Sequence, residues 1–152
     1  LARKLVREAM GLGVHDAFPG EGGATVAEVL LRPHVTYLPA LRPVLDRMHA
    51  MAHITGGGLP GNVNRMLPPT LDAVIETTTW TVPNLFAQLQ AAGRVGTMEM
   101  YRTFNMGVGM VIACDAADAD AILAAAQAAG QGAWRIGQVV AGTGAVRLDP
   151  LS

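Results

Sequence analysis

The chain has 152 residues, which is enough for one domain with a core of ordinary depth. Hydrophobic residues make up 51% and charged residues 15% of the chain, so we expect either a sheet covered on both faces or a surface that another domain covers. The net charge of −1 argues against a nucleic-acid partner, the single cysteine excludes an internal disulfide, and no apolar run reaches the roughly 18 residues of a membrane span.

The first part of the chain predicts three helices and two strands separated by loops rich in glycine and proline. Thr25 and Glu28 have the spacing of a capping box, so a short helix is expected between them and Leu31, ahead of Pro33. Hydrophobic periodicity gives the remaining elements of this part: a helix over 1–10, a loop over 15–24, a strand over 35–38, a helix over 41–48 and a strand over 50–54.

The second part predicts four helices and four strands. They are a short helix over 63–67, a strand over 73–76, a helix with its start signal at Thr81 and Pro83 and its end at Gly93, a helix begun by Thr97, a strand over 107–114, a helix over 115–129, and strands over 133–140 and 145–148. The run over 107–114 is almost wholly apolar, which is typical of a strand buried on both faces. Its glycines, Gly107 and Gly109, would let another backbone approach closely. Strands and helices thus interleave, and we predict a mixed α/β sandwich.

The most informative stretch runs from His53 to Asn62 and reads as a strand end, a tight loop and a helix start. Its three consecutive glycines, Gly56, Gly57 and Gly58, allow backbone N–H groups to converge on one anion, with help from the positive end of the following helix. No lysine follows them, and the spacing is not that of a dinucleotide fingerprint. The triplet therefore predicts either a generic anion-binding loop or a plain tight turn.

Five polar side chains accompany this loop or resemble ligands for an anion. His53, Thr55 and Asn62 face a ligand or anchor the loop, and the residue types fit both interpretations. Arg102 fits a phosphate clamp or a surface ion pair, because guanidinium groups serve in both. Asn105 fits a ligand contact or a left-handed helix terminus.

Other candidates point away from catalysis by this chain alone. Asp115, Asp118 and Asp120 lie where a helix is expected to begin, so they are predicted to complement its dipole and not to bind a metal. Cys114 is predicted to be an inert thiol in a buried strand, which is compatible with a reducing compartment. No nucleophile elbow, zinc-protease motif or zinc-binding cysteine pair occurs, so the catalytic residues stay unassigned.

Three blocks together resemble the phosphoribosylformylglycinamidine cyclo-ligase family, the aminoimidazole ribonucleotide (AIR) synthetases: His-Ile-Thr-Gly-Gly-Gly from position 53 with Asn62, Met-Glu-Met-Tyr-Arg-Thr-Phe-Asn-Met-Gly-Val-Gly-Met from position 98, and Ala-Trp-Arg-Ile-Gly from position 133. The resemblance covers the family's carboxyl-terminal domain, here 1–152. It implies a three-layer α/β/α sandwich around a mixed sheet. The family's amino-terminal ATP-binding domain is absent from this chain, so we expect the chain alone to be inactive.

For the intact protein, the resemblance implies a cytoplasmic ligase of purine biosynthesis that closes the imidazole ring of its ribonucleotide substrate with ATP and Mg²⁺, both bound mainly by the missing domain. It also implies a homodimer, with no nucleic-acid or membrane partner. The substrate or phosphate site expected in this chain comprises His53, Thr55, Gly56, Gly57, Gly58, Asn62, Arg102 and Asn105, with no metal ligand. Two alternatives remain: a related enzyme of the thiamine-monophosphate kinase or selenophosphate synthetase type, and a non-catalytic interaction module.

Overall fold

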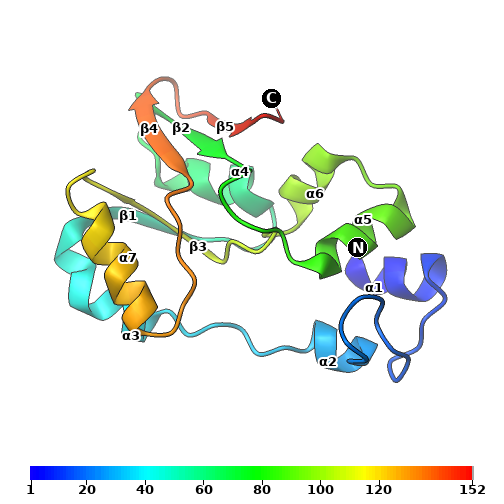
Figure 1. The fold of residues 1–152 in the computed structure, drawn as a ribbon. Helices are drawn as coiled ribbons and strands as arrows, with labels where there is room; N and C mark the ends of the chain where they lie inside the picture. Colours follow the sequence, from blue (N-terminus) through cyan, green and yellow to red (C-terminus); the bar gives the residue numbers. More distant parts are fainter. Residues whose placement is uncertain (152) are drawn as a thin grey trace.

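Residues 1–151 are described by a computed structural model, in which helices flank two small β-sheets (Figure 1). β1 (Met48–His53) pairs antiparallel with β3 (Met110–Cys114), while β2 (Leu71–Glu76) lies between antiparallel β4 (Gly137–Ala141) and parallel β5 (Val146–Asp149). The mixed α/β class is therefore confirmed. The described part contains five strands, one fewer than expected, and they form two separate sheets.

The helices are short, and several continue as tighter or wider turns. They are α1 (Ala2–Lys4) with the π-helical turn η1 (Leu5–Ala9), α2 (Val26–Leu30), α3 (Leu38–Leu41) with the 3₁₀ turn η2 (Arg42–Arg47), α4 (Gly58–Val63) with the 3₁₀ turn η3 (Asn64–Met66), α5 (Asn84–Gly93), α6 (Thr97–Thr103) and α7 (Ala119–Ala128). Across the described residues, none of these helices has the length and apolar character needed to cross a membrane.

Local sequence signals place two of the helices correctly. At the start of α2, the Glu28 amide donates to Thr25 Oγ1 at 3.3 Å, and the Thr25 amide donates to Glu28 Oε2 at 2.7 Å, so the predicted capping box is confirmed. The helix predicted from the start signal at Thr81 and Pro83 is also confirmed as α5, which begins after Pro83 and ends at Gly93 as expected. Both outcomes depend on interactions between residues close in sequence, and such signals can be read without the rest of the fold.

Other local signals were wrong. The strand expected over 35–38 is absent, because this segment pairs with no strand and its second half turns into a helix: Tyr37 has helical backbone angles, and α3 begins at Leu38 with Pro39 in its first turn. Thr97 does not cap α6; Gly96 holds that position, and Thr97 Oγ1 accepts a hydrogen bond from Gln90 at 3.1 Å. The helix expected from position 115 begins only at Ala119.

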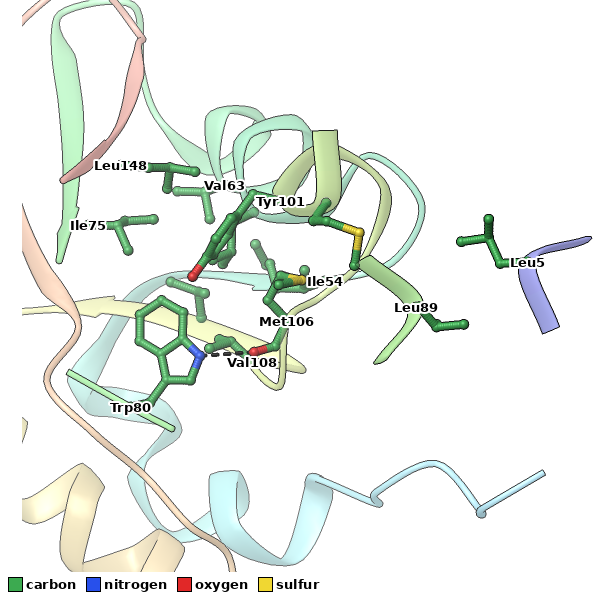
Figure 2. Packing of buried hydrophobic residues seen from close by; sticks show 14 of the residues in the cluster. Leu5, Ile54, Val63, Ile75, Trp80, Leu89, Tyr101, Met106, Val108 and Leu148 are labelled. Carbon is green, nitrogen blue, oxygen red and sulfur yellow. Dashed lines mark hydrogen bonds between the residues drawn. The ribbon is translucent and has the colours of Figure 1, made fainter. Parts of the chain in front are cut away.

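The core joins all the described strands except β4 to the helices α2, α4, α5 and α6 and the turn η1, as the buried side chains in Figure 2 illustrate. Leu59 of α4 and Met100 of α6 are fully buried there. The indole of Trp80 donates from Nε1 to the carbonyl oxygen of Met106 at 2.9 Å, and its ring meets that of Tyr101 edge to face, with ring centres 6.5 Å apart. These contacts fix α6 and the segment after it to the connection between β2 and α5.

Asp72 of β2 holds the segment that connects β4 to β5 in the three-stranded sheet. Asp72 is buried in β2, and its Oδ1 accepts hydrogen bonds from the amides of Thr143 at 2.7 Å and Ala145 at 2.9 Å. These bonds, with the nearby Arg147 guanidinium, hold the pKa of the Asp72 carboxyl below its usual value. Asp72 therefore fixes the segment 142–144, which joins β4 to β5.

Candidate functional site

The glycine loop connects β1 to α4, and its first half is exposed. Thr55, Gly56 and Gly57 lie at the surface, whereas Ile54 before them is buried and donates its amide to the Gly109 carbonyl at 2.9 Å. Gly57 has a φ of +97° and caps α4. Within residues 1–151, the amides of Gly56 and Gly57 donate to no other group, so both remain available to a ligand.

Gly58 serves packing. Its amide donates to the Thr55 carbonyl at 3.0 Å, so it is not available to a ligand. Its φ is +58°, and a Cβ atom built on it would overlap the carbonyl oxygen of Tyr101 in α6 and lie 2.9 Å from that of Phe104. Only glycine lets α4 approach the end of α6 this closely. The three glycines therefore differ in role, which the triplet alone did not indicate.

Asn62 holds the loop in place. Its side chain is buried, and Nδ2 lies 2.8 Å from the carbonyl oxygen of Gly58, 3.3 Å from that of Gly56 and 3.4 Å from that of Thr55. Its Oδ1 lies 3.4 Å from Nη1 of Arg65. The structure thus supports the anchoring interpretation for Asn62. Because α4 has only six residues, the helix dipole adds little to the loop, and the exposed amides are the main attraction for an anion.

A surface pocket of about 260 Å³ opens beside the loop, between the end of β1 and the helices α5 and α6. Six residues from three segments line it: Ile54, Thr55, Phe86, Thr103, Phe104 and Asn105. The Phe86 and Phe104 rings are 5.6 Å apart and form its apolar side. Thr55, Thr103 and Asn105 supply the polar groups of the lining, and the Thr55 hydroxyl makes a long contact of 3.5 Å with Asn62 Oδ1.

Asn105 is held in a defined orientation by its own backbone. Its Oδ1 accepts a hydrogen bond from the Gly107 amide at 3.0 Å, which leaves the NH₂ group of the same side chain free to donate to a ligand. Thr103 Oγ1 lies 3.2 Å from Glu99 Oε1, and its proton is directed to that carboxylate. The structure therefore brings Thr55 and Asn105, two of the predicted residues, to one pocket.

The structure places Arg102 and His53 outside this pocket lining. Arg102 is exposed on α6, next to Thr103, and takes part in none of the ion pairs found in the described chain. His53 ends β1, and its Nε2 lies 2.7 Å from Nε2 of His34. Of the eight predicted residues, Thr55 and Asn105 line the pocket, Gly56 and Gly57 expose free amides beside it, and Gly58 and Asn62 shape the loop.

The three acidic residues around the start of α7 each face a basic side chain from another part of the chain. Arg47 donates to Asp118 at 2.7 Å, Arg135 donates to Asp120 at 2.7 Å, and His49 lies 3.2 Å from Asp115.

Burial and the neighbouring carboxylates raise the pKa of the Cys114 thiol, which favours its unreactive protonated form at neutral pH.

Sequence reasoning missed Thr103, Phe104 and Phe86 as lining residues. Thr103 and Phe104 lie inside the block that carries the family resemblance, directly beside Arg102, so their position in that block was the available signal. Phe86 gave no such signal, because its helical periodicity indicated a core position and only the packing of α5 brings its ring to the pocket.

Comparisons with known proteins agree with the fold and the resemblance. Three proteins named phosphoribosylformylglycinamidine cyclo-ligase are similar to this chain. The protein of Trichlorobacter lovleyi is 45% identical to it, over 91% of this chain and 40% of its own length. Those of Geotalea daltonii and Geobacter metallireducens are each 40% identical to it, over 97% of this chain and 44% of their own lengths. The chain thus spans less than half the length of these relatives.

A solved structure shares the fold at lower sequence identity. Thiamine-monophosphate kinase from Stenotrophomonas maltophilia K279a matches with a TM-score of 0.68 over 97% of this chain and 46% of its own, at 17% identity, which supports the fold alone. The family described as AIR synthase related protein, C-terminal domain, matches residues 7–149. Because this match covers nearly the whole chain and includes both the glycine loop and α6, the chain belongs to the AIR synthase related protein family as its C-terminal domain.

Proposed function

We propose that this domain forms one wall of the substrate cleft of a phosphoribosylformylglycinamidine cyclo-ligase. The complete enzyme would convert formylglycinamidine ribonucleotide to aminoimidazole ribonucleotide with ATP, in purine biosynthesis. Relatives with that name, 40% to 45% identical over almost the entire chain, support this proposal. The observation that carries it is the pocket, where the glycine loop and the end of α6, two blocks of the family resemblance, supply Thr55 and Asn105 to the same cavity.

In this proposal the pocket positions a phosphate or another oxyanion of the substrate. The free amides of Gly56 and Gly57 and the Asn105 NH₂ group are hydrogen-bond donors suited to anionic oxygens. The Thr55 hydroxyl joins them in this proposal by turning away from Asn62 Oδ1, with which its contact is long at 3.5 Å. Arg102, exposed beside Thr103, adds a positive charge that has no competing carboxylate in the described chain. Such groups serve by positioning and by electrostatic stabilisation, which dominate catalysis of phosphoryl transfer.

We further propose that residues outside this chain bind ATP and Mg²⁺. Among residues 1–151, no three His, Cys, Asp or Glu side chains gather in an arrangement suited to a metal ion, and the glycine loop lacks the lysine of a nucleotide phosphate loop. When bound, ATP would activate the formyl amide oxygen of the substrate. The expected partners are an amino-terminal domain, a second copy of the enzyme, and the ribonucleotide; the expected compartment is the cytoplasm.

The sharpest test replaces a single donor without changing its shape. In the complete polypeptide that carries this domain, Asn105→Asp keeps Oδ1 for the Gly107 amide and replaces the NH₂ donor with a carboxylate oxygen. Hydrogen bonds to charged groups are worth about 1.5–3 kcal/mol, so we expect kcat/KM for formylglycinamidine ribonucleotide to fall by at least about tenfold.

Two further variants and one control complete the test. Thr55→Val removes the second donor at nearly constant volume, and Arg102→Ala removes the charge; each should lower kcat/KM by about tenfold. Asn64→Ala, an exposed asparagine in η3 outside the pocket lining, is the matched control and should leave the kinetics unchanged. Unaltered kinetics in Asn105→Asp and Thr55→Val would reject this pocket as the substrate site.

The structural likeness to thiamine-monophosphate kinase keeps a related ATP-dependent kinase as the second candidate. Assaying the complete polypeptide with formylglycinamidine ribonucleotide and with thiamine monophosphate separates the two, because each enzyme turns over only its own substrate. Calorimetry of the 152-residue chain with ribose 5-phosphate tests the remaining alternative, a non-catalytic interaction module. Binding that Asn105→Asp abolishes supports a preformed anion site, whereas its absence favours a domain that depends on its partner.

A further inference from the structure

Outside the pocket, two histidines from distant segments meet through the same ring nitrogen. Nε2 of His34 lies 2.7 Å from Nε2 of His53, and the ring centres are 4.8 Å apart at an interplanar angle of 47°. Both residues are exposed, so solvent and dissolved ions reach the pair. His53 is the last residue of β1, whereas His34 belongs to the extended segment between α2 and α3.

The surrounding structure holds both rings in position. His53 is fixed by the β1–β3 ladder, in which it pairs with Met110. Tyr37 packs its ring edge-on against both histidines, with ring centres 5.6 Å from His34 and 6.1 Å from His53. The hydroxyl of Tyr37 fills the space that the missing side chain of Gly109 leaves, which anchors the His34 segment to the residue before β3. The pair is therefore preorganised although it is exposed.

The chemistry of this contact favours a shared cation. A hydrogen bond between two imidazoles requires one neutral ring with a lone pair at Nε2, which is the form that ligates metals. Zinc binds imidazole nitrogen at about 2.0–2.1 Å, so tetrahedral geometry places two ligating nitrogens roughly 3.3 Å apart. The Nε2 atoms would therefore have to separate by only about 0.6 Å, which small rotations of exposed rings provide.

From this geometry we propose that His34 and His53 form a binding site for a borderline transition-metal cation of the zinc class. Water completes the coordination, since no third His, Cys, Asp or Glu joins the pair within the described chain. Imidazole ligands favour zinc, nickel and copper over Mg²⁺, so the site is separate from the Mg²⁺ of the proposed reaction. The inference stands on the pair alone and does not depend on the proposed function.

Calorimetric titration of the 152-residue chain with Zn²⁺ tests the proposal. We expect one zinc ion per chain, displaced by Ni²⁺ or Cu²⁺ but not by excess Mg²⁺. His34→Gln and His53→Gln should each weaken binding by at least about tenfold, a loss that even a change around a metal ligand can cause. His49→Gln is the matched control, because His49 is an exposed histidine on the same strand that contacts Asp115 instead.

Each outcome decides for or against the site. Equal losses of zinc affinity in His34→Gln and His49→Gln would identify adventitious binding to surface imidazoles. If the chain binds no zinc at all, the two histidines form a hydrogen-bonded pair only. Either result overturns the proposal. Circular dichroism of the variants checks folding, and His34→Gln is the decisive variant because His34 lies outside every helix and strand. Substitution with Co²⁺ adds a second readout: an absorption band typical of nitrogen ligation should disappear in His34→Gln.

Discussion

The contact between Gly58 and α6 gives the most discriminating stability prediction. Gly58→Ala would place a Cβ atom 2.8 Å from the carbonyl carbon of Tyr101 and 2.9 Å from the carbonyl oxygen of Phe104, and it would overlap the Tyr101 oxygen. Backbone atoms of a packed helix cannot move aside as a flexible side chain can. A left-handed conformation costs a non-glycine residue about 1–2 kcal/mol, and overpacking a core costs about 1–3 kcal/mol more.

The expected loss for Gly58→Ala is therefore about 2–5 kcal/mol, a large share of the roughly 5–15 kcal/mol that stabilises a typical domain. Urea unfolding of the 152-residue chain at constant pH measures it. The neighbouring glycines provide graded controls. Gly57→Ala carries the strain of a φ of +97° without a collision and should cost about 1–2 kcal/mol. Gly56→Ala meets no atom within 4 Å and should change stability by less than about 1 kcal/mol.

The three variants distinguish the predicted collision at Gly58 from a general sensitivity of the loop to substitution. If Gly58→Ala unfolds at the same urea concentration as Gly56→Ala, the close approach of α4 to α6 is wrong, and with it the shape of the pocket. If all three unfold at lower concentrations by the same amount, a general sensitivity of the loop explains the loss and the specific collision does not. The reasoning survives only if the loss of stability increases in the order Gly56, Gly57, Gly58.

Three further changes test other parts of the fold. Asp72→Asn should destabilise the chain at pH 7, because the folded state holds the carboxyl pKa below its usual 3.8. The difference in stability from the unmodified chain should persist above pH 3.8 and vanish as the pH falls through the lowered pKa, which urea unfolding at a series of pH values measures. Thr25→Ala removes the cap of α2 and should cost about 1 kcal/mol, or nothing if the capping box is not formed in solution. Trp80→Phe leaves the buried Met106 carbonyl without its donor and should cost about 1–3 kcal/mol by thermal or urea unfolding, with a smaller effect contradicting that hydrogen bond.

What the sequence predicted correctly was encoded within a few residues. The capping box of Thr25 and Glu28, the stripe of α5 and the apolar run that contains β3 each carry their signal locally. The expected burial of that run on both faces was wrong, because only Val111 of β3 is buried. The expected strand over 35–38 has the right local composition, yet a strand exists only when a partner edge receives its hydrogen bonds, and no strand pairs with this segment. Pro39 instead suits the first turn of α3.

The candidate site shows the same division. Thr55 and Asn105 were predicted from residue type and from the resemblance, and the structure brings both to one pocket although they are 50 positions apart. The partner of His53 was not predictable, because His34 lies 19 residues away in a segment without regular structure. The distinct role of Gly58 likewise depends on a helix more than 40 residues further along the chain. Such long-range contacts leave no periodic mark in the sequence.

The single buried amide of Asn62 also determines the electrical character of the loop surface. By drawing three loop carbonyls toward one NH₂ group, it leaves neutral N–H dipoles on the outer side. Such dipoles do not titrate and act only at short range, unlike a lysine or arginine. An oxyanion seated on the loop would therefore respond to acidity only through its own protonation, and added salt would weaken its attachment far less than it weakens binding to a guanidinium.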